Sequence, residues 1–282
     1  MSGFLLVPTC MFGNYSSITA SESIGIVYNA MNSPKSDYAA VDAATNMDFT
    51  HSAALSFPTS FASNPAAFWL KLGDGILDGA DPNNHYFQLW TGATAGTVAQ
   101  KTLAAVYGDC AVNGNDVEVN TAIAKTNGFA HLIGVFDDQY SSVVWRIAEN
   151  YYGTGGGVTS FYLYEVIVGF KVSLPSGFLR EDRSIQRVHY GGRVGTKKFG
   201  DSNWSGIYSY SPRKSFELTL ENTSSTNRDI FLDVFKYSRG VFPILVVEDQ
   251  SDKTTWTKCK MVRYQEEEDA EMFTVTMEFD EI

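Results

Sequence analysis

The alternation of apolar and polar residues in the last quarter of the chain, residues 215–282, constrains the fold most. From Ser215 to Glu221, even positions are apolar and odd positions are polar, which is the two-residue period of a strand with one buried face. The same alternation returns in Met272–Asp280, with the apolar residues at odd positions. These patterns predict strands of a sheet that buries one face and leaves the other polar.

One helix is predicted between these strands, over Asn227–Arg239. Thr226 with Asp229 three residues later fits the acidic form of a capping box, and Gly240 stands where a residue in the left-handed region often ends a helix. An apolar stripe at helical spacing runs along the segment: Ile230, Phe231, Val234 and Phe235. Such a stripe must be buried against another element, which the neighbouring strands supply.

Two further strands complete this unit. Val241–Val247 is apolar apart from its proline, as expected of a strand covered on both faces, and Thr255–Tyr264 follows after a polar loop. The order of strand, helix and three strands resembles the β-sandwich-plus-helix unit of tailed-phage tail-tube proteins and of the distal-tail and minor-tail proteins that reuse it. The alternative is an arbitrary α+β or all-β domain. The segments that carry the resemblance are Ser215–Glu221, Asn227–Arg239, Val241–Val247, Thr255–Tyr264 and Met272–Asp280.

The resemblance implies a structural virion protein of a bacteriophage tail, at the tail tip or baseplate. Such a protein is expected to assemble as a ring around the DNA channel, and the family favours a hexameric ring. It would contact other tail proteins, act without catalysis, and reside in the virion after assembly in the host bacterial cytoplasm. DNA would pass through the ring without specific binding.

The first half of the chain predicts a mostly-β architecture. Short apolar runs recur with glycine, asparagine and aspartate between them, which favours a jelly-roll-like β-sandwich over alternating strands and helices. The longest run, Phe161–Val172, should be central in its sheet, whereas Ala39–Ala44 is predicted as a helical turn. The predicted domains are residues 1–175, an N-terminal β-sandwich, and residues 176–282, a connector followed by the C-terminal β-sandwich with one packed α-helix. The connector, Phe178–Pro212, is expected to pack across the second domain with a hairpin near Ile207–Tyr210.

Charge is unevenly distributed along the chain. The net charge is −11, but eight acids and no base lie between Tyr264 and Ile282. In a ring, acids facing inward would form a channel wall to which phosphate does not bind. The predicted channel-facing acids are Glu266, Glu267, Glu268, Asp269, Glu271, Glu278 and Asp280. The plain alternative for Glu266–Asp269 and Glu271 is a solvated hairpin loop. The predicted inter-subunit basic residues are Arg180, Arg183, Arg187, Arg193, Lys197 and Lys198.

Other site chemistry has weak signals. Asp74, Asp78 and Asp81 are calcium candidates, although turn formation explains their spacing better. No motif for a nucleophile, a phosphate loop or a zinc site is present, so no catalytic residue, resident metal or cofactor is predicted, and a glycoside hydrolase or esterase is the least supported function. Asp137 and Asp138 are interpreted as a turn.

A carbohydrate-binding or host-receptor-binding adhesin is the alternative function. Tyr151, Tyr152 and Trp204 lie in irregular segments and are the best candidates for exposed rings that stack on a host surface glycan. No apolar run approaches the roughly 20 residues that a membrane helix needs, so membrane insertion is not expected. Cys10, Cys110 and Cys259 are too dispersed for a disulfide framework and are expected to be reduced thiols.

Overall fold

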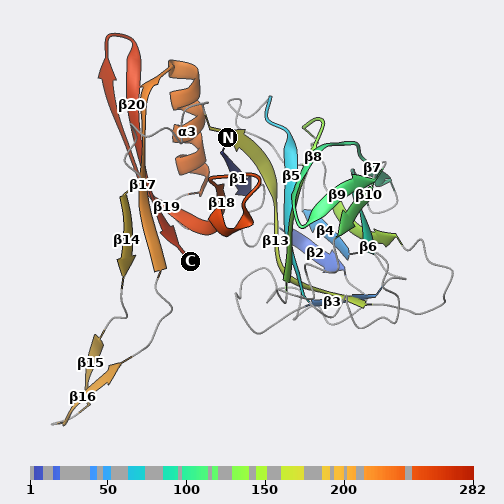
Figure 1. Cartoon of the computed structure of the whole chain (residues 1–282), viewed down its shortest axis with the longest axis horizontal. Helices are drawn as coiled ribbons and strands as arrows, with labels where there is room; N and C mark the ends of the chain where they lie inside the picture. The colour runs from blue at the N-terminus through green and yellow to red at the C-terminus, as the bar shows by residue number, and fades with distance from the viewer. Residues whose placement is uncertain are drawn as a thin grey trace.

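The computed structural model is mostly β-sheet, and α3 (Ser225–Ser238) is the α-helix among its described residues (Figure 1). A short 3-10 turn, η3 (Lys253–Thr255), precedes β19. The structure describes residues 3–8, 15–19, 39–42, 47–51, 63–73, 85–94, 97–113, 116–119, 129–139, 144–150, 160–174, 186–190, 194–199, 202–207, 213–238 and 243–282.

Three antiparallel sheets contain the described strands. The larger sheet has the order β14-β17-β20-β19-β18-β1-β13-β5-β11-β8, with β3 also paired to β13. Its strands are β14 (Gln186–Tyr190), β17 (Arg213–Thr223), β20 (Met272–Glu281), β19 (Trp256–Asp269), β18 (Ile244–Val247), β1 (Phe4–Pro8), β13 (Ser160–Ser173), β5 (Ala66–Gly73), β11 (Phe129–Phe136), β8 (Leu103–Gly108) and β3 (Ala39–Asp42).

The second sheet has the order β2-β4-β12-β6-β10-β9, with β7 paired to β6. Its strands are β2 (Tyr15–Thr19), β4 (Met47–His51), β12 (Val144–Asn150), β6 (His85–Gly92), β10 (Asp116–Val119), β9 (Cys110–Asn113) and β7 (Ala99–Gln100). The third sheet is a hairpin of β15 (Val194–Phe199) and β16 (Ser202–Ile207).

Strand β1 joins the two ends of the chain within the larger sheet. Phe4 is the register partner of Ser173 in β13 on one side and of Val247 in β18 on the other. Backbone hydrogen bonding therefore connects strands from both predicted domains in one sheet. The predicted boundary at 175/176 lies outside the described residues and stays a prediction. The predicted central position of Phe161–Val172 is confirmed, because β13 lies between β1 and β5.

Helix α3 covers one face of the β17-β20-β19-β18-β1 part of the larger sheet. Its Phe231 and Val234 are fully buried against strand residues such as Leu220 and Val275. Burial of each such side chain stabilises the fold by about 1.5–3 kcal/mol. The predicted apolar stripe is thus the packing face of the helix.

The helix begins earlier than predicted. Ser224 caps it, because the backbone N–H of Asn227 donates to Ser224 Oγ at 3.3 Å, whereas Thr226 lies inside the first turn. The prediction of a helical turn at Ala39–Ala44 is wrong for its first four residues. Those residues form β3, because pairing with β13 outweighs the strong helical preference of Ala39 and Ala40.

The β15–β16 hairpin ends at Ile207, the first residue of the hairpin predicted near Ile207–Tyr210, and residues 208–210 lie outside the described residues. Val194 is paired with Ile207 and Phe199 with Ser202. Figure 1 shows this hairpin projecting from the body beyond β14, at the lower left. Among the described strands, β15 and β16 pair only with each other, whereas β14 of the connector pairs with β17; the expected packing of the connector across the second domain stays a prediction.

Candidate functional site

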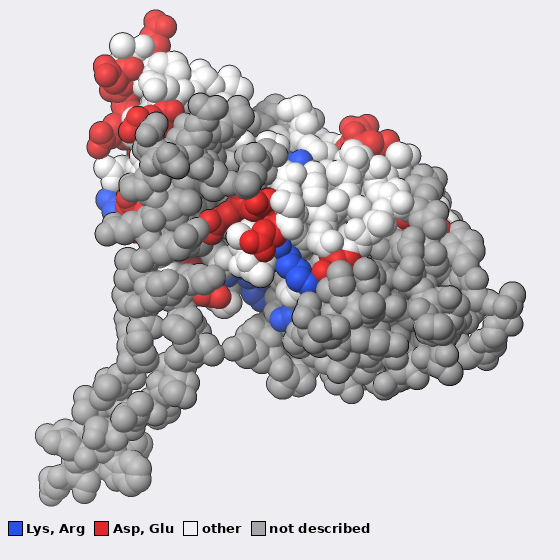
Figure 2. All heavy atoms as spheres, in the orientation of Figure 1, with Lys and Arg blue, Asp and Glu red and all other residues white. Residues whose placement is uncertain are grey.

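The β19–β20 hairpin carries most of the acids singled out in the sequence. Glu266–Asp269 lies within β19, which pairs with β20 as far as Asp269 and Met272. The turn is only Ala270 and Glu271, with φ angles of +47° and +74°. The acidic run is therefore the end of a strand and not the predicted hairpin loop. Figure 2 shows acidic side chains gathered at the upper left, where Figure 1 places this tip.

An irregularity in β19 divides the acids between two faces. The pairing register shifts between Met261 and Arg263, so Val262 is an extra residue and the alternation reverses there. Before the bulge, buried Met261 faces α3; beyond it, Tyr264 does so. The sequence does not predict this bulge, because the extra residue breaks the alternation by which a strand is recognised.

The predicted channel-facing acids consequently do not share one face. Glu266 is the register partner of buried Val275, which places it on the side of α3, and Glu268 follows two residues later on the same side. Arg263 pairs with Glu278 on the opposite side. The acids on that opposite face, by register, are Glu267, Asp269, Glu278 and Asp280. Glu271 lies in the turn.

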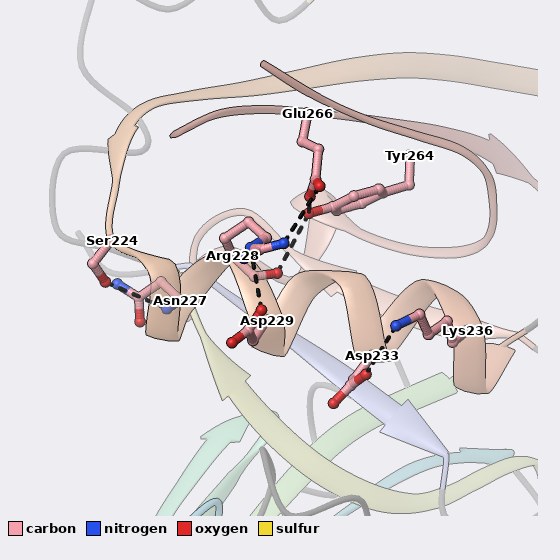
Figure 3. Close-up of polar contacts among 8 residues, drawn as sticks. All are labelled: Ser224, Asn227, Arg228, Asp229, Asp233, Lys236, Tyr264 and Glu266. Carbon is pink, nitrogen blue, oxygen red and sulfur yellow. Dashed lines mark hydrogen bonds and ion pairs between the residues drawn. The ribbon is translucent and has the colours of Figure 1, made fainter. Parts of the chain in front are cut away.

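Arg228 of α3 fastens the helix to the hairpin (Figure 3). Its guanidinium lies 3.4 Å from Glu266 Oε1, 3.1 Å from Asp229 Oδ1, and 4.5 Å from the centre of the Phe273 ring. The side chain of Arg228 is 24% exposed. A partly buried cation with a carboxylate and an aromatic face as neighbours is well compensated. Sequence reasoning missed this residue, because nothing local links a helix arginine to a strand that begins 28 residues later.

Tyr264 completes the contact. Its hydroxyl donates to Glu266 Oε2 at 2.9 Å, and its ring stacks on Phe235 with centroids 5.9 Å apart. Burial raises the pKa of Tyr264 well above its usual range, and the hydrogen bond to Glu266 raises it further. The tyrosine therefore stays a neutral donor at physiological pH. Glu266 is committed to holding the hairpin on the helix.

The face of the hairpin opposite α3 is polar. Arg263 binds Glu278 at 2.7 Å and Gln265 at 2.6 Å, and Thr219 hydrogen-bonds Thr276 at 3.2 Å across β17 and β20. Glu217 stands directly opposite Glu278 in the register. Like charges in this position repel, and Arg263 offsets part of that repulsion.

A second polar cluster closes the larger sheet on itself. Lys253, beside β19, binds Asp109 at 2.7 and 2.5 Å, although five strands separate β19 from the β8 end of the sheet. Next to it Gly108 has φ +96° and so little space that an added Cβ would lie 2.7 Å from the Trp256 ring. The sheet therefore curls until its β8 edge meets the β18–β19 connection. The apolar cluster of Phe4, Trp69, Ile133 and Leu245 lies on this curled face.

His131 borders this closure. Its backbone N–H donates to Asp109 Oδ2 at 3.1 Å, and its ring stacks on Trp69. Burial, together with the charges of Lys71 and Lys253, lowers the pKa of His131 to about 4, although the nearby charge of Asp109 acts in the opposite direction. The imidazole is therefore neutral at physiological pH. The arrangement holds two distant parts of the chain together and presents no exposed nucleophile.

Several predicted sites fall outside the description. Asp74, Asp78, Asp81, Tyr151, Tyr152, Arg180, Arg183, Arg193 and Cys10 lie outside the described residues. Only the backbones of Arg187, Lys197, Lys198 and Trp204 are described, in β14, β15 and β16. Asp137 and Asp138 are exposed and follow β11 directly, as the predicted turn requires. Cys110 and Cys259 are free thiols.

Neither a metal site nor a membrane helix emerges from the part of the chain that the structure describes. No group of three or more histidine, cysteine, aspartate or glutamate side chains there is placed to hold a metal ion. None of the helices in that part is both long and apolar enough to cross a bilayer. Comparison with protein-family models, with curated proteins and with solved structures finds no match for this chain.

Proposed function

We propose that this protein is a structural component of a bacteriophage tail tip or baseplate, assembling as a ring around the DNA channel and acting without catalysis. The observation that carries the proposal is the C-terminal unit: one helix packed on an antiparallel sheet whose longest hairpin ends in exposed acids. This is the arrangement expected from the resemblance to tail-tube and distal-tail proteins.

The division of the acids refines which residues would line the channel. Glu267, Asp269, Glu278 and Asp280 share the face opposite α3, and a wall of such carboxylates would repel DNA phosphates. Glu266 and Glu268 would not belong to that wall, because they lie on the side of the helix. Arg228 and Tyr264 would serve to hold the hairpin rigid against the passing genome.

Oligomeric mass tests the ring. A hexamer would have a mass of about 187 kDa, six times the 31.1 kDa of one chain. Native mass spectrometry of the purified protein, together with electron microscopy of particles that contain it, should show a closed ring around an axial channel. A chain that stays monomeric and enters no particle would refute the proposal.

Charge reversal tests the channel face. Glu267→Lys with Asp269→Lys should leave the ring intact but cause it to retain double-stranded DNA at low salt, because lysines bind phosphate by counterion release. The matched control is Asp137→Lys with Asp138→Lys, an equal reversal of charge at two exposed positions that follow β11, away from the β19–β20 hairpin. Equal DNA retention by the two variants would place the channel elsewhere.

A further inference from the structure

Lys171 is a charged side chain on an otherwise apolar face. In β13 it lies four residues after Ile167, so it shares the face on which Ile167 packs into the apolar cluster of the curled sheet. Its Nζ lies 5.1 Å from the centre of the Phe4 ring and 5.6 Å from the centre of the Tyr107 ring. The centres of these two rings are 5.8 Å apart. The ammonium is therefore held where β1 and β8 approach each other across the curl.

No carboxylate balances this charge among the contacts described for Lys171. Its polar side-chain contact is with Tyr107 Oη at 3.5 Å, the outer limit of a hydrogen bond. None of the described ion pairs includes Lys171. Aromatic faces compensate part of the hydration that a partly buried ammonium loses. An ammonium has three N–H donors, however, so Lys171 retains donor capacity for an anionic acceptor.

Two side chains near Lys171 or on its face have buried polar atoms without a described partner. Asn64 donates from Nδ2 to the backbone carbonyl of Lys171 at 2.9 Å, and its buried Oδ1 accepts no described hydrogen bond. Trp69, the register partner of Ile167, is 4% exposed, and its Nε1–H has no described acceptor. Native proteins pair nearly all buried polar atoms. An unsatisfied donor on the same face as an unbalanced cation therefore points to a ligand with acceptor oxygens.

We propose that Lys171 and Tyr107 bind the carboxylate group of a small organic acid with an apolar body. One carboxylate oxygen accepts from Lys171 Nζ and the other from the Tyr107 hydroxyl, and the apolar body lies against the rings of Phe4 and Tyr107. Both donor side chains are partly exposed, so a ligand reaches them from solvent. Few polar donors beside aromatic walls suit such an acid, whereas phosphate is typically bound by arginines or by the N–H groups of a helix N-terminus. This site does not depend on assembly and so goes beyond the proposed function.

Titration calorimetry with sodium benzoate tests the site. Benzyl alcohol is the matched ligand with the same ring and no charge, and inorganic phosphate is the matched ligand with charge and no ring. We expect the natural chain to bind benzoate about tenfold more tightly than either of them, because a charge-assisted hydrogen bond is about twice as strong as a neutral one and the rings favour an apolar body.

Two variants assign the binding to named groups. Lys171→Met keeps an unbranched side chain beside the rings but removes the charge, and it should weaken benzoate binding about tenfold. Tyr107→Phe keeps the ring but removes the hydroxyl, and it should weaken binding about threefold even if Lys171→Met fails to fold. The control Lys236→Met, at a side chain that is 63% exposed on α3, should bind benzoate as the natural chain does.

Three results would overturn the proposal. They are the absence of saturable benzoate binding by the natural chain up to about 50 mM, full benzoate affinity in folded Lys171→Met or in Tyr107→Phe, and phosphate binding as tight as that of benzoate. None of these results bears on the proposed ring, whose test is oligomeric mass.

Discussion

The pair of Lys253 and Asp109 should contribute more to stability than any other described ion pair. Asp109 is 6% exposed and Lys253 25% exposed, so both charges are largely removed from water. Besides Lys253, the carboxylate accepts only the backbone N–H of His131 among the bonds described above. Lys253→Met would leave that buried carboxylate without its cation.

Removing one partner of a buried pair typically costs about 3–5 kcal/mol. Because a quarter of Lys253 is exposed, the lower end applies, and we expect Lys253→Met to reduce the free energy of unfolding by about 3 kcal/mol. Asp109→Asn should cost about 2 kcal/mol, since the lysine can then turn towards solvent while the amide oxygen still accepts from His131. The double variant should cost less than the sum by at least about 1 kcal/mol.

Urea unfolding followed by tryptophan fluorescence measures all three variants, and the double-mutant cycle isolates the pair. Lys236→Met is the matched control, because Lys236 is 63% exposed and lies 3.8 Å from Asp233; its loss should change stability by less than about 0.5 kcal/mol. If Lys253→Met behaves like this control, or if the two single effects simply add, the closure of the sheet does not depend on the pair.

Three further predictions follow from local geometry. Ala270→Asn with Glu271→Gly should raise the free energy of unfolding by about 1–2 kcal/mol in urea melts. The reason is that both turn residues have positive φ, and a type I′ hairpin turn prefers Asn-Gly. As a control, Glu221→Gly in β17 should instead lower the free energy of unfolding. His131 has a folded pKa of about 4 against 6.5 unfolded, so the unfolded chain binds more protons between these values and stability falls as pH drops from 6.5 towards 4. That loss, up to roughly 3 kcal/mol, should be absent in His131→Gln, and identical pH profiles for the two proteins would contradict it. Burial, reinforced by Asp109, raises the pKa of the Cys110 thiol to about 12, so peptide mapping after iodoacetamide at pH 8 should find Cys110 labelled roughly a thousandfold more slowly in the folded than in the unfolded protein.

The sequence predicted the elements whose pattern is local and regular. The strand around Phe216–Leu220, the helix with its Phe231 face and the long strand β13 were all evident, because period and length identify such segments. Strands without clean alternation, such as Val194–Phe199 and Cys110–Asn113, were missed. The mostly-β class with one packed helix is confirmed. The residue that caps the helix was not predicted correctly, because the choice of Ser224 depends on a side-chain hydrogen bond.

The features that shape the site depend on contacts between distant residues. The bulge at Val262, which redistributes the acids, is one extra residue whose position only strand pairing reveals. The attachment of Arg228 to Glu266 and of Lys253 to Asp109 joins residues 38 and 144 positions apart. The periodicity of a single sequence does not encode contacts between such distant residues. The acids were therefore predicted to share one face, whereas the fold divides them between two faces.

The position of β1 has a consequence for biosynthesis. Leu5 and Leu6 are synthesised long before Leu245 and Val246, so one edge of their strand stays open until those two partners have left the ribosome. Contacts with so large a sequence separation make folding slow. A chain that stops short of residue 244 should therefore expose an apolar β-edge and precipitate or require a chaperone. Synthesis of β18 ends this exposure, because β18 pairs with the open edge of β1.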